Sequence, residues 1–194
     1  MIKQRILITG ALGQLGVSLI RVLSKRSDTY ILATDIYAPK EEIDVDFECV
    51  NALDTNRLEE LIVQHKIDCI YHLAAISYHE EYWNDPLSTY MVDCISSVYF
   101  LEAIKAINPK IKFLNISSSE IYGLQNGAMD ENSYMKPATP YAIAKSMSQK
   151  NVELYRDKFN IFACNAICFN HESERRNSRF VTRKISSGVA NIFL

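Results

Sequence analysis

The stretch TGALGQLG, residues 9–16, contains three glycines at regular spacing. It follows the short apolar run RILI and precedes QLGVSLIRVLSKR, in which apolar residues recur at helical spacing. Three glycines at such a junction permit a tight turn, a close approach of the backbone to a pyrophosphate and close packing of helix on strand. The N–H groups at the start of the helix then face the phosphates. This pattern predicts a dinucleotide site that contains Gly10, Gly13, Gln14, Leu15 and Gly16.

The rest of the chain alternates between short apolar runs and segments with helical spacing. The apolar runs lie at residues 30–35, 47–52, 68–75, 111–117 and 161–169, after the first at 5–10. The helical patterns lie at 56–65, 86–107, 141–159 and 180–192. Continuous apolar strands that alternate with helices indicate a parallel sheet with helices on both faces. We therefore predict an α/β fold, a doubly wound parallel sheet of the Rossmann type, as a single NAD(P)-binding domain over residues 1–194.

The composition indicates which kinds of binding partner and which cellular compartment to expect. The formal charge of −2 and the isoelectric point near 6.1 give no reason to expect nucleic acid or an anionic membrane as a partner. No apolar run approaches the length of a membrane span, and the first residues do not resemble a signal peptide. The five cysteines are odd in number and form no CxxC pair. They predict buried free thiols in a reducing cytoplasm rather than disulfides or a metal site.

Two acidic residues follow the second and third apolar runs. Asp35 ends the second run about twenty residues after the glycines, where a carboxylate can bond both ribose hydroxyls of an adenosine. Because a 2′-phosphate would meet Asp35 as a like charge, this residue favours NAD over NADP; the alternative is a turn with the residues that follow it. Asp54 either reaches the adenine edge or caps the helix after it, and the sequence does not separate these two roles.

Polar residues with catalytic character gather at two places. In PYAIAK, residues 140–145, the four-residue spacing places Tyr141 and Lys145 on one helical face. An ammonium beside a phenol lowers the pKa of the phenol and favours a phenolate base, although an ordinary surface pair has the same spacing. The fifth apolar run ends in SSSE, so the carboxylate of Glu120 must stay solvated, find a partner or shift its pKa.

Taken together, these motifs carry a family resemblance. TGxxGxxG, the HLAA of residues 72–75, the serine-rich strand end and YxxxK resemble the extended short-chain dehydrogenase/reductases. SSSEIYG (117–123), TPYAIAK (139–145) and the block FNHESERR…FVTRKI (169–185) are similar to the GDP-mannose 4,6-dehydratase family. The last block weighs most because it is long and unusual in composition.

The resemblance implies a lyase reaction in three steps on a nucleotide sugar, GDP-mannose. Tyr141 takes the proton of the 4-hydroxyl while hydride leaves C4 for the nicotinamide, a carboxylate removes the C5 proton as water leaves C6, and hydride returns to C6. The product is a 4-keto-6-deoxy sugar nucleotide, and no cofactor is consumed. In this family the strand-end carboxylate, here Glu120, serves as the acid/base for the elimination, and Ser118 matches the hydroxyl that bonds the 4-oxygen.

Further site residues follow from the same resemblance. Lys145 would also bond the nicotinamide ribose, and Asn170 matches a substrate-contacting position. The remaining cofactor positions would be Leu73, Ala74, Ala75, Ser77, His171 and Arg176. Taken alone, the polar residues 170–176 are equally compatible with a solvated loop.

Other implications concern cofactor, length and assembly. The arginines that NADP-dependent members carry after the second strand are replaced by Asp35 and its neighbours, which leaves NAD or NADP open and favours NAD. Members of the family are considerably longer than 194 residues, so we expect most of the C-terminal substrate lobe to be absent. Family analogy implies a homodimer through the helices at 86–107 and 141–159. Tyr90, Val98, Tyr99 and Leu101 are compatible with such a contact, although burial in the core would give the same pattern.

Two other functions remain open at this stage. One is an epimerase or ketoreductase of the same superfamily, which Asp35 mildly favours and Glu120 disfavours. The other is a non-catalytic, cofactor-binding or partner-binding module.

Overall fold

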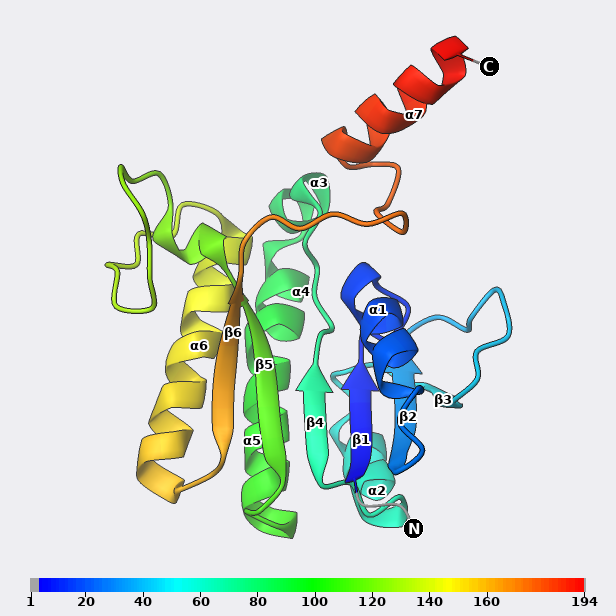
Figure 1. The fold of residues 1–194 in the computed structure, drawn as a ribbon. Helices are drawn as coiled ribbons and strands as arrows, with labels where there is room; N and C mark the ends of the chain where they lie inside the picture. Colours follow the sequence, from blue (N-terminus) through cyan, green and yellow to red (C-terminus); the bar gives the residue numbers. More distant parts are fainter. Residues whose placement is uncertain (1–3, 194) are drawn as a thin grey trace.

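The computed structural model describes residues 4–193, and its centre is a six-stranded parallel sheet with the strand order β3-β2-β1-β4-β5-β6 (Figure 1). The strands are β1 (Gln4–Thr9), β2 (Thr29–Asp35), β3 (Asp46–Cys49), β4 (Cys69–His72), β5 (Lys112–Ser118) and β6 (Ala163–Cys168). Each coincides with one of the apolar runs, so the prediction of a parallel α/β sheet is confirmed. The order reverses between β1 and β4, and in open parallel sheets ligands bind beyond the carboxyl ends of the strands at this switch point.

Helices connect the strands and cover the sheet. They are α1 (Gln14–Leu23), α2 (Thr55–Gln64), α3 (His79–Asn84), α4 (Pro86–Tyr90), α5 (Ser96–Ile107), α6 (Pro140–Phe159) and α7 (Val181–Phe193). The predicted helix at 86–107 is continuous, but a π-helical turn, η1 (Met91–Ile95), joins α4 to α5 within it. A short 3₁₀ turn, η2 (Ser119–Tyr122), follows β5.

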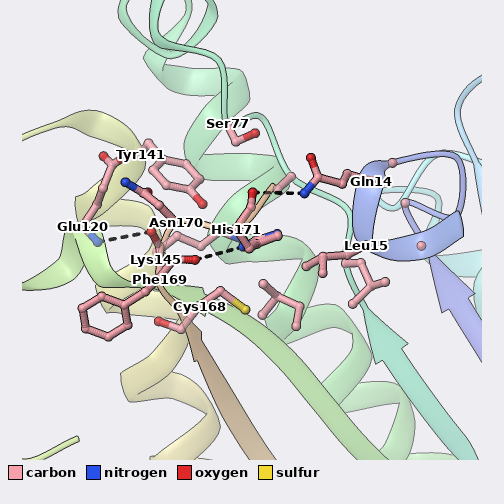
Figure 2. Close-up of a pocket in the computed structure, with 18 of the residues that line it drawn as sticks. Gln14, Leu15, Ser77, Glu120, Tyr141, Lys145, Cys168, Phe169, Asn170 and His171 are labelled. Atoms are coloured by element: carbon pink, nitrogen blue, oxygen red, sulfur yellow. Dashed lines mark hydrogen bonds between the residues drawn. The ribbon is translucent and has the colours of Figure 1, made fainter. Parts of the chain in front are cut away.

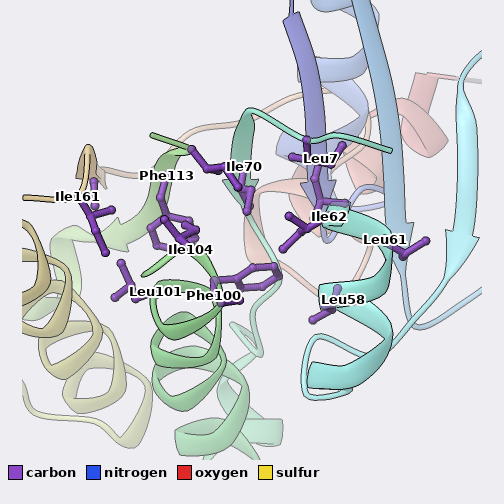
Figure 3. Close-up of a cluster of buried hydrophobic side chains, with 14 of the residues drawn as sticks. Leu7, Leu58, Leu61, Ile62, Ile70, Phe100, Leu101, Ile104, Phe113 and Ile161 are labelled. Atoms are coloured by element: carbon purple, nitrogen blue, oxygen red, sulfur yellow. The ribbon is translucent and has the colours of Figure 1, made fainter. Parts of the chain in front are cut away.

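The larger core lies between the sheet and the helices α2, α5 and α6 (Figure 3). Helix α2 contributes Leu58, Leu61 and Ile62 to it. Leu101 of α5 is fully buried in this core, so of its two possible roles, dimer contact or core residue, the structure supports the second. This layer fixes the positions of α5 and α6 relative to β5, and hence the geometry at the carboxyl end of that strand.

The opposite face of the sheet is covered unevenly. Helix α1 packs on β1 and β2, with Leu23, Ile31 and Ala33 in a second core (Figure 1). Figure 1 shows no helix in front of β5 and β6, where Leu114 and Ile116 are only half-buried. The prediction of helices on both faces therefore holds for one half of the sheet among residues 4–193.

Helix α7, near the end of the chain, is open to solvent. Helix α7 stands away from the sheet, beyond the carboxyl ends of the strands (Figure 1). Its apolar residues Val181, Ile185, Val189 and Ile192 are exposed.

All five cysteines are free; Cys69 and Cys94 are buried as predicted, but Cys49 is exposed. No helix within residues 4–193 has both the length and the apolarity to cross a bilayer.

Candidate active site

A cleft of about 250 Å³ opens at the carboxyl ends of β1, β4, β5 and β6 (Figure 2). In Figure 2, Gln14 and Leu15 lie on one side of it, and Glu120, Tyr141 and Lys145 lie on the other. Fifteen of the residues singled out from the sequence line this cleft: Gly10, Gly13, Gln14, Leu15, Gly16, Leu73, Ala75, Ser77, Ser118, Glu120, Tyr141, Lys145, Asn170, His171 and Arg176. Segments more than a hundred residues apart in the chain therefore line the same cleft.

The glycine turn has no space for side chains. A Cβ on Gly10, whose φ is +63°, would lie 2.7 Å from the Ala74 backbone nitrogen, and one on Gly16 would lie 2.5 Å from the Ala11 carbonyl oxygen. Gly13 caps α1 without a side-chain hydrogen bond, so no side chain occupies the N–H groups of its first turn. Bare backbone at a helix N-terminus fits a pyrophosphate, and the residues present therefore fit a dinucleotide.

Three predicted residues do not line the cleft: Asp35, Asp54 and Ala74. Asp35 accepts the N–H of Leu12 at 3.0 Å and the N–H of Ile36 at 2.8 Å, so it ties β2 to the glycine turn. Asp54 accepts the N–H of Arg57 at 3.1 Å as the N-cap of α2, which is one of its two expected roles. Ala74 donates its N–H to the Thr9 hydroxyl at 3.3 Å and crowds Gly10.

Tyr141 and Lys145 project from the first turns of α6. Pro140 occupies the first turn, and Thr139 caps the helix by accepting the N–H of Ala142 at 3.0 Å. The Lys145 nitrogen lies 5.7 Å from the centre of the Tyr141 ring. Burial raises the pKa of Tyr141, and the lowering effect of Lys145 does not cancel it. Lys145 thus lowers the pKa of Tyr141 as predicted, but in the protein alone desolvation of the phenolate outweighs this effect.

Glu120 stands at the mouth of the cleft, just past β5. Its backbone N–H donates to Ser118 at 3.2 Å, which shapes the η2 turn. Its carboxylate accepts from the Thr139 hydroxyl at 3.4 Å. The side chain reaches solvent, yet desolvation by the surrounding protein raises its pKa, in spite of Thr139 and the nearby His79. A raised pKa makes this carboxylate a stronger base than a solvated glutamate.

The segment after β6 crosses the cleft. Gln14 of α1 donates to the carbonyl oxygen of His171 at 3.1 Å (Figure 2). The guanidinium of Arg176 stacks on Phe180, 3.7 Å from the ring centre. The loop that matched the dehydratase family thereby links α1 to the far side of the site.

Three residues at the site were not identified from the sequence. In the sequence, Thr139 was considered only as part of the TPYAIAK motif. In the structure, Tyr82 stacks on Tyr141 with ring centres 5.7 Å apart, and Asp93 pairs with Lys145 at 3.1 Å. The threonine immediately before Pro140 is a recognisable helix cap and could have been found. The other two had no local signal, because their partners lie about fifty residues or more away in the chain.

Comparison with known proteins agrees with this geometry. A sequence model of the GDP-mannose 4,6 dehydratase family matches residues 7–194. The chain belongs to this family. It is 36% identical to the GDP-mannose 4,6-dehydratase of Vibrio cholerae over 98% of its own length and 56% of that protein. It is 39% identical to the human GDP-mannose 4,6 dehydratase over 73% of its own length and 39% of that protein.

Solved structures resemble the whole described fold. A UDP-glucuronic acid 4-epimerase from Bacillus cereus, in complex with UDP-glucuronic acid and NAD, superposes with a TM-score of 0.86 at 25% identity, over 97% of this chain and 63% of the epimerase. A dTDP-glucose 4,6-dehydratase from Bacillus anthracis, in complex with NAD, gives 0.85 at 19% identity, over 97% of this chain and 61% of that one. The chain thus spans only part of such proteins, 56% of the Vibrio cholerae relative and 63% of the epimerase.

Proposed function

We propose that this chain carries the cofactor site and catalytic groups of a nucleotide-sugar 4,6-dehydratase, which converts GDP-mannose to GDP-4-keto-6-deoxymannose. One observation carries the proposal: the Glu120 carboxyl, with its raised pKa, lines the same cleft as Tyr141 and Lys145. A C5/C6 elimination needs a carboxylate at this place in addition to the tyrosine. Family membership over residues 7–194 supports the same reaction.

Each residue has a defined task in this reaction. Bound NAD or NADP would accept hydride from C4 of the sugar and return it to C6. Tyr141 takes the proton of the 4-hydroxyl, and the ammonium of Lys145 stabilises the phenolate that precedes this step. Ser118 holds the 4-oxygen. Glu120 then removes the C5 proton, which the 4-ketone has made acidic, and passes it to the C6 hydroxyl, which leaves as water. The proton held by Tyr141 is available to C5 when hydride returns to C6.

Cofactor and compartment are part of the proposal. The glycine turn would hold the pyrophosphate, and Asp35 at the end of β2 favours NAD because a 2′-phosphate would meet its negative charge. The NAD complexes of the similar epimerase and dehydratase structures support this choice. The five free cysteines support a reducing compartment such as the cytoplasm.

A 4-epimerase is the second candidate, favoured by the likeness to the UDP-glucuronic acid 4-epimerase. An epimerase inverts C4 and eliminates nothing, so it leaves the mass of the sugar nucleotide unchanged. The two functions therefore differ in a single measurable quantity.

We also infer a homodimer through α4, α5 and α6. Ile143, Met147 and Leu154 form an apolar stripe on α6, since they lie four and seven residues apart and all three are exposed. Leu87 and Met91, on the α4–η1 segment, are exposed as well. An apolar stripe of this kind on a helix indicates a protein contact.

The test is to incubate the purified chain with GDP-mannose and NAD or NADP, and to follow the sugar nucleotide by mass spectrometry. We expect loss of one water, and a fall in kcat of about 10²–10⁴-fold for Glu120→Gln and for Tyr141→Phe. Glu131→Gln, in the exposed loop after η2, is the matched control and should leave kcat unchanged.

The outcomes separate the candidates. Inversion at C4 without loss of water would make the protein an epimerase. Bound cofactor with no turnover would make it a non-catalytic dinucleotide-binding module.

A further inference from the structure

An ion pair lies completely inside the protein, beside the catalytic tyrosine. The ammonium of Lys145 and the Oδ1 atom of Asp93 are 3.1 Å apart, and their side chains are 3% and 0% exposed. The second oxygen of Asp93, Oδ2, accepts the backbone N–H of Ile76 at 2.9 Å. Asp93 thus connects α6 to the loop between β4 and α3, which lines the cleft through Ala75 and Ser77.

The π-helical turn η1 brings Asp93 into this position. A π turn inserts one residue into the helical register, and such turns are found frequently at functional sites. The turn is fastened by Ser96, whose hydroxyl donates to the Val92 carbonyl oxygen at 2.6 Å and lies 2.7 Å from the Nε2 atom of His72. The Asp93 end of the contact to Lys145 is therefore held by the fold.

A buried lysine needs such a counter-ion to keep its charge. Burial alone lowers the pKa of Lys145, but Asp93 and Tyr141 outweigh burial and raise it. Without the carboxylate, desolvation would favour the neutral amine, as it does for isolated buried lysines. A neutral amine would not stabilise a phenolate at Tyr141.

We propose that Asp93 is a positioning residue that fixes the ammonium of Lys145 beside Tyr141 and ties it to the cofactor side of the cleft through Ile76. The contact itself is independent of the reaction, whereas its role in catalysis rests on the proposed function, in which Lys145 supports Tyr141 as the base. The other titratable groups around the ammonium are Tyr141 on α6, Cys168 at the end of β6, Cys94 on η1 and His72 at the end of β4. None of these other groups is a carboxylate, so Asp93 alone among them supplies one to Lys145.

The variant Asp93→Asn tests this role with little change of shape, since an amide oxygen can still accept from Ile76. The ionisation of Lys145 is followed by NMR of protein labelled with ¹³C,¹⁵N-lysine, with the signal assigned by its loss in Lys145→Arg. We expect Lys145 of the natural chain to titrate above the exposed lysines, and Lys145 of Asp93→Asn to titrate at least about one pH unit lower. Asp157→Asn, at an Asp that is 75% exposed on α6, is the matched control and should change nothing.

A second arm measures the pH dependence of kcat. Asp93→Asn should lower kcat by about 10–100-fold with KM within about threefold, and kcat should fall at alkaline pH as the amine loses its proton. A merely structural pair would not produce this alkaline fall.

Each result decides a different question. An unchanged titration of Lys145 in Asp93→Asn would overturn the proposal. A natural chain in which Lys145 titrates below the exposed lysines would also overturn it, and this measurement does not depend on whether the variant folds. A shifted titration with an unchanged pH profile would overturn the catalytic role. If the natural chain shows no turnover at all, the proposed function fails, and the NMR titration alone decides the part of Asp93.

Discussion

At the residue scale, His72 has an unusual environment for a titratable side chain. It is 3% exposed at the end of β4, with its Nδ1 atom 2.8 Å from the Thr9 hydroxyl and its Nε2 atom 2.7 Å from the Ser96 hydroxyl. Burial, and secondarily the charge of Lys145, lowers its pKa from the ordinary 6.5 to about 3. The neutral ring is therefore the form that joins β1 and β4 to the π-helical turn beneath the site.

This shift predicts acid sensitivity of the fold. Below pH 6.5 the unfolded chain binds a proton at His72 that the folded chain does not, so stability is lost as pH falls from 6.5 towards 3. One such proton costs about 1.4 kcal/mol per pH unit, or on the order of 5 kcal/mol over the whole window. The measurement is the free energy of unfolding in urea at several pH values, for the natural chain and for His72→Asn.

The variant is expected to be less stable at neutral pH, because two hydrogen bonds and close packing are disturbed, but its stability should depend less on pH. His79→Asn, at an exposed histidine, should keep the slope of the natural chain. Equal slopes for the natural chain and His72→Asn would show that His72 takes up its proton in the folded state.

Among the elements, α2 is preceded by an acidic residue, Asp54, for which the sequence allowed two roles. The geometry assigns Asp54 to the N-cap through its bond to Arg57, and the residue does not line the cleft. Asp54→Ala should therefore destabilise the protein by about 1 kcal/mol, whereas Asp54→Asn, which keeps the cap, should cost much less. Thermal unfolding measures both, and a titration with NAD should give the same Kd for both variants. If Asp54→Ala bound NAD more weakly without losing stability, Asp54 would instead contact the adenine of the cofactor.

At the scale of the whole molecule, the apolar stripe on α6 predicts the oligomeric state. Met147 is 50% exposed in the middle of this stripe, so Met147→Glu should turn the expected dimer into a monomer because a charge cannot be buried there without a partner. Light scattering after size exclusion measures the mass of each species. Leu124→Glu, at a loop residue that is 97% exposed, is the control and should leave the dimer intact. A monomeric natural chain, or a dimeric Met147→Glu, would contradict the proposed interface.

The sheet, the glycine turn and most residues that line the cleft could be predicted from local sequence patterns and motif resemblance. Strand and helix periods are local properties, and the positions of Gly10, Gly13 and Gly16 relative to them already predict a parallel sheet with a site at its carboxyl edge. Motif resemblance added residues on β5, α6 and the loop after β6, and the structure brings Ser118, Tyr141 and His171 to the same cleft.

How those groups are paired, and how their pKa values shift, follows from tertiary packing alone. Asp93 meets Lys145, and Tyr82 meets Tyr141, because the core places α3, η1 and α6 side by side, and no local spacing encodes these contacts. The net pKa of Tyr141 likewise depends on desolvation as well as on the neighbouring cation, and burial is a property of the packed molecule. For the same reason Leu101 could be read from the sequence as an apolar helix residue, but only packing shows that it faces the core.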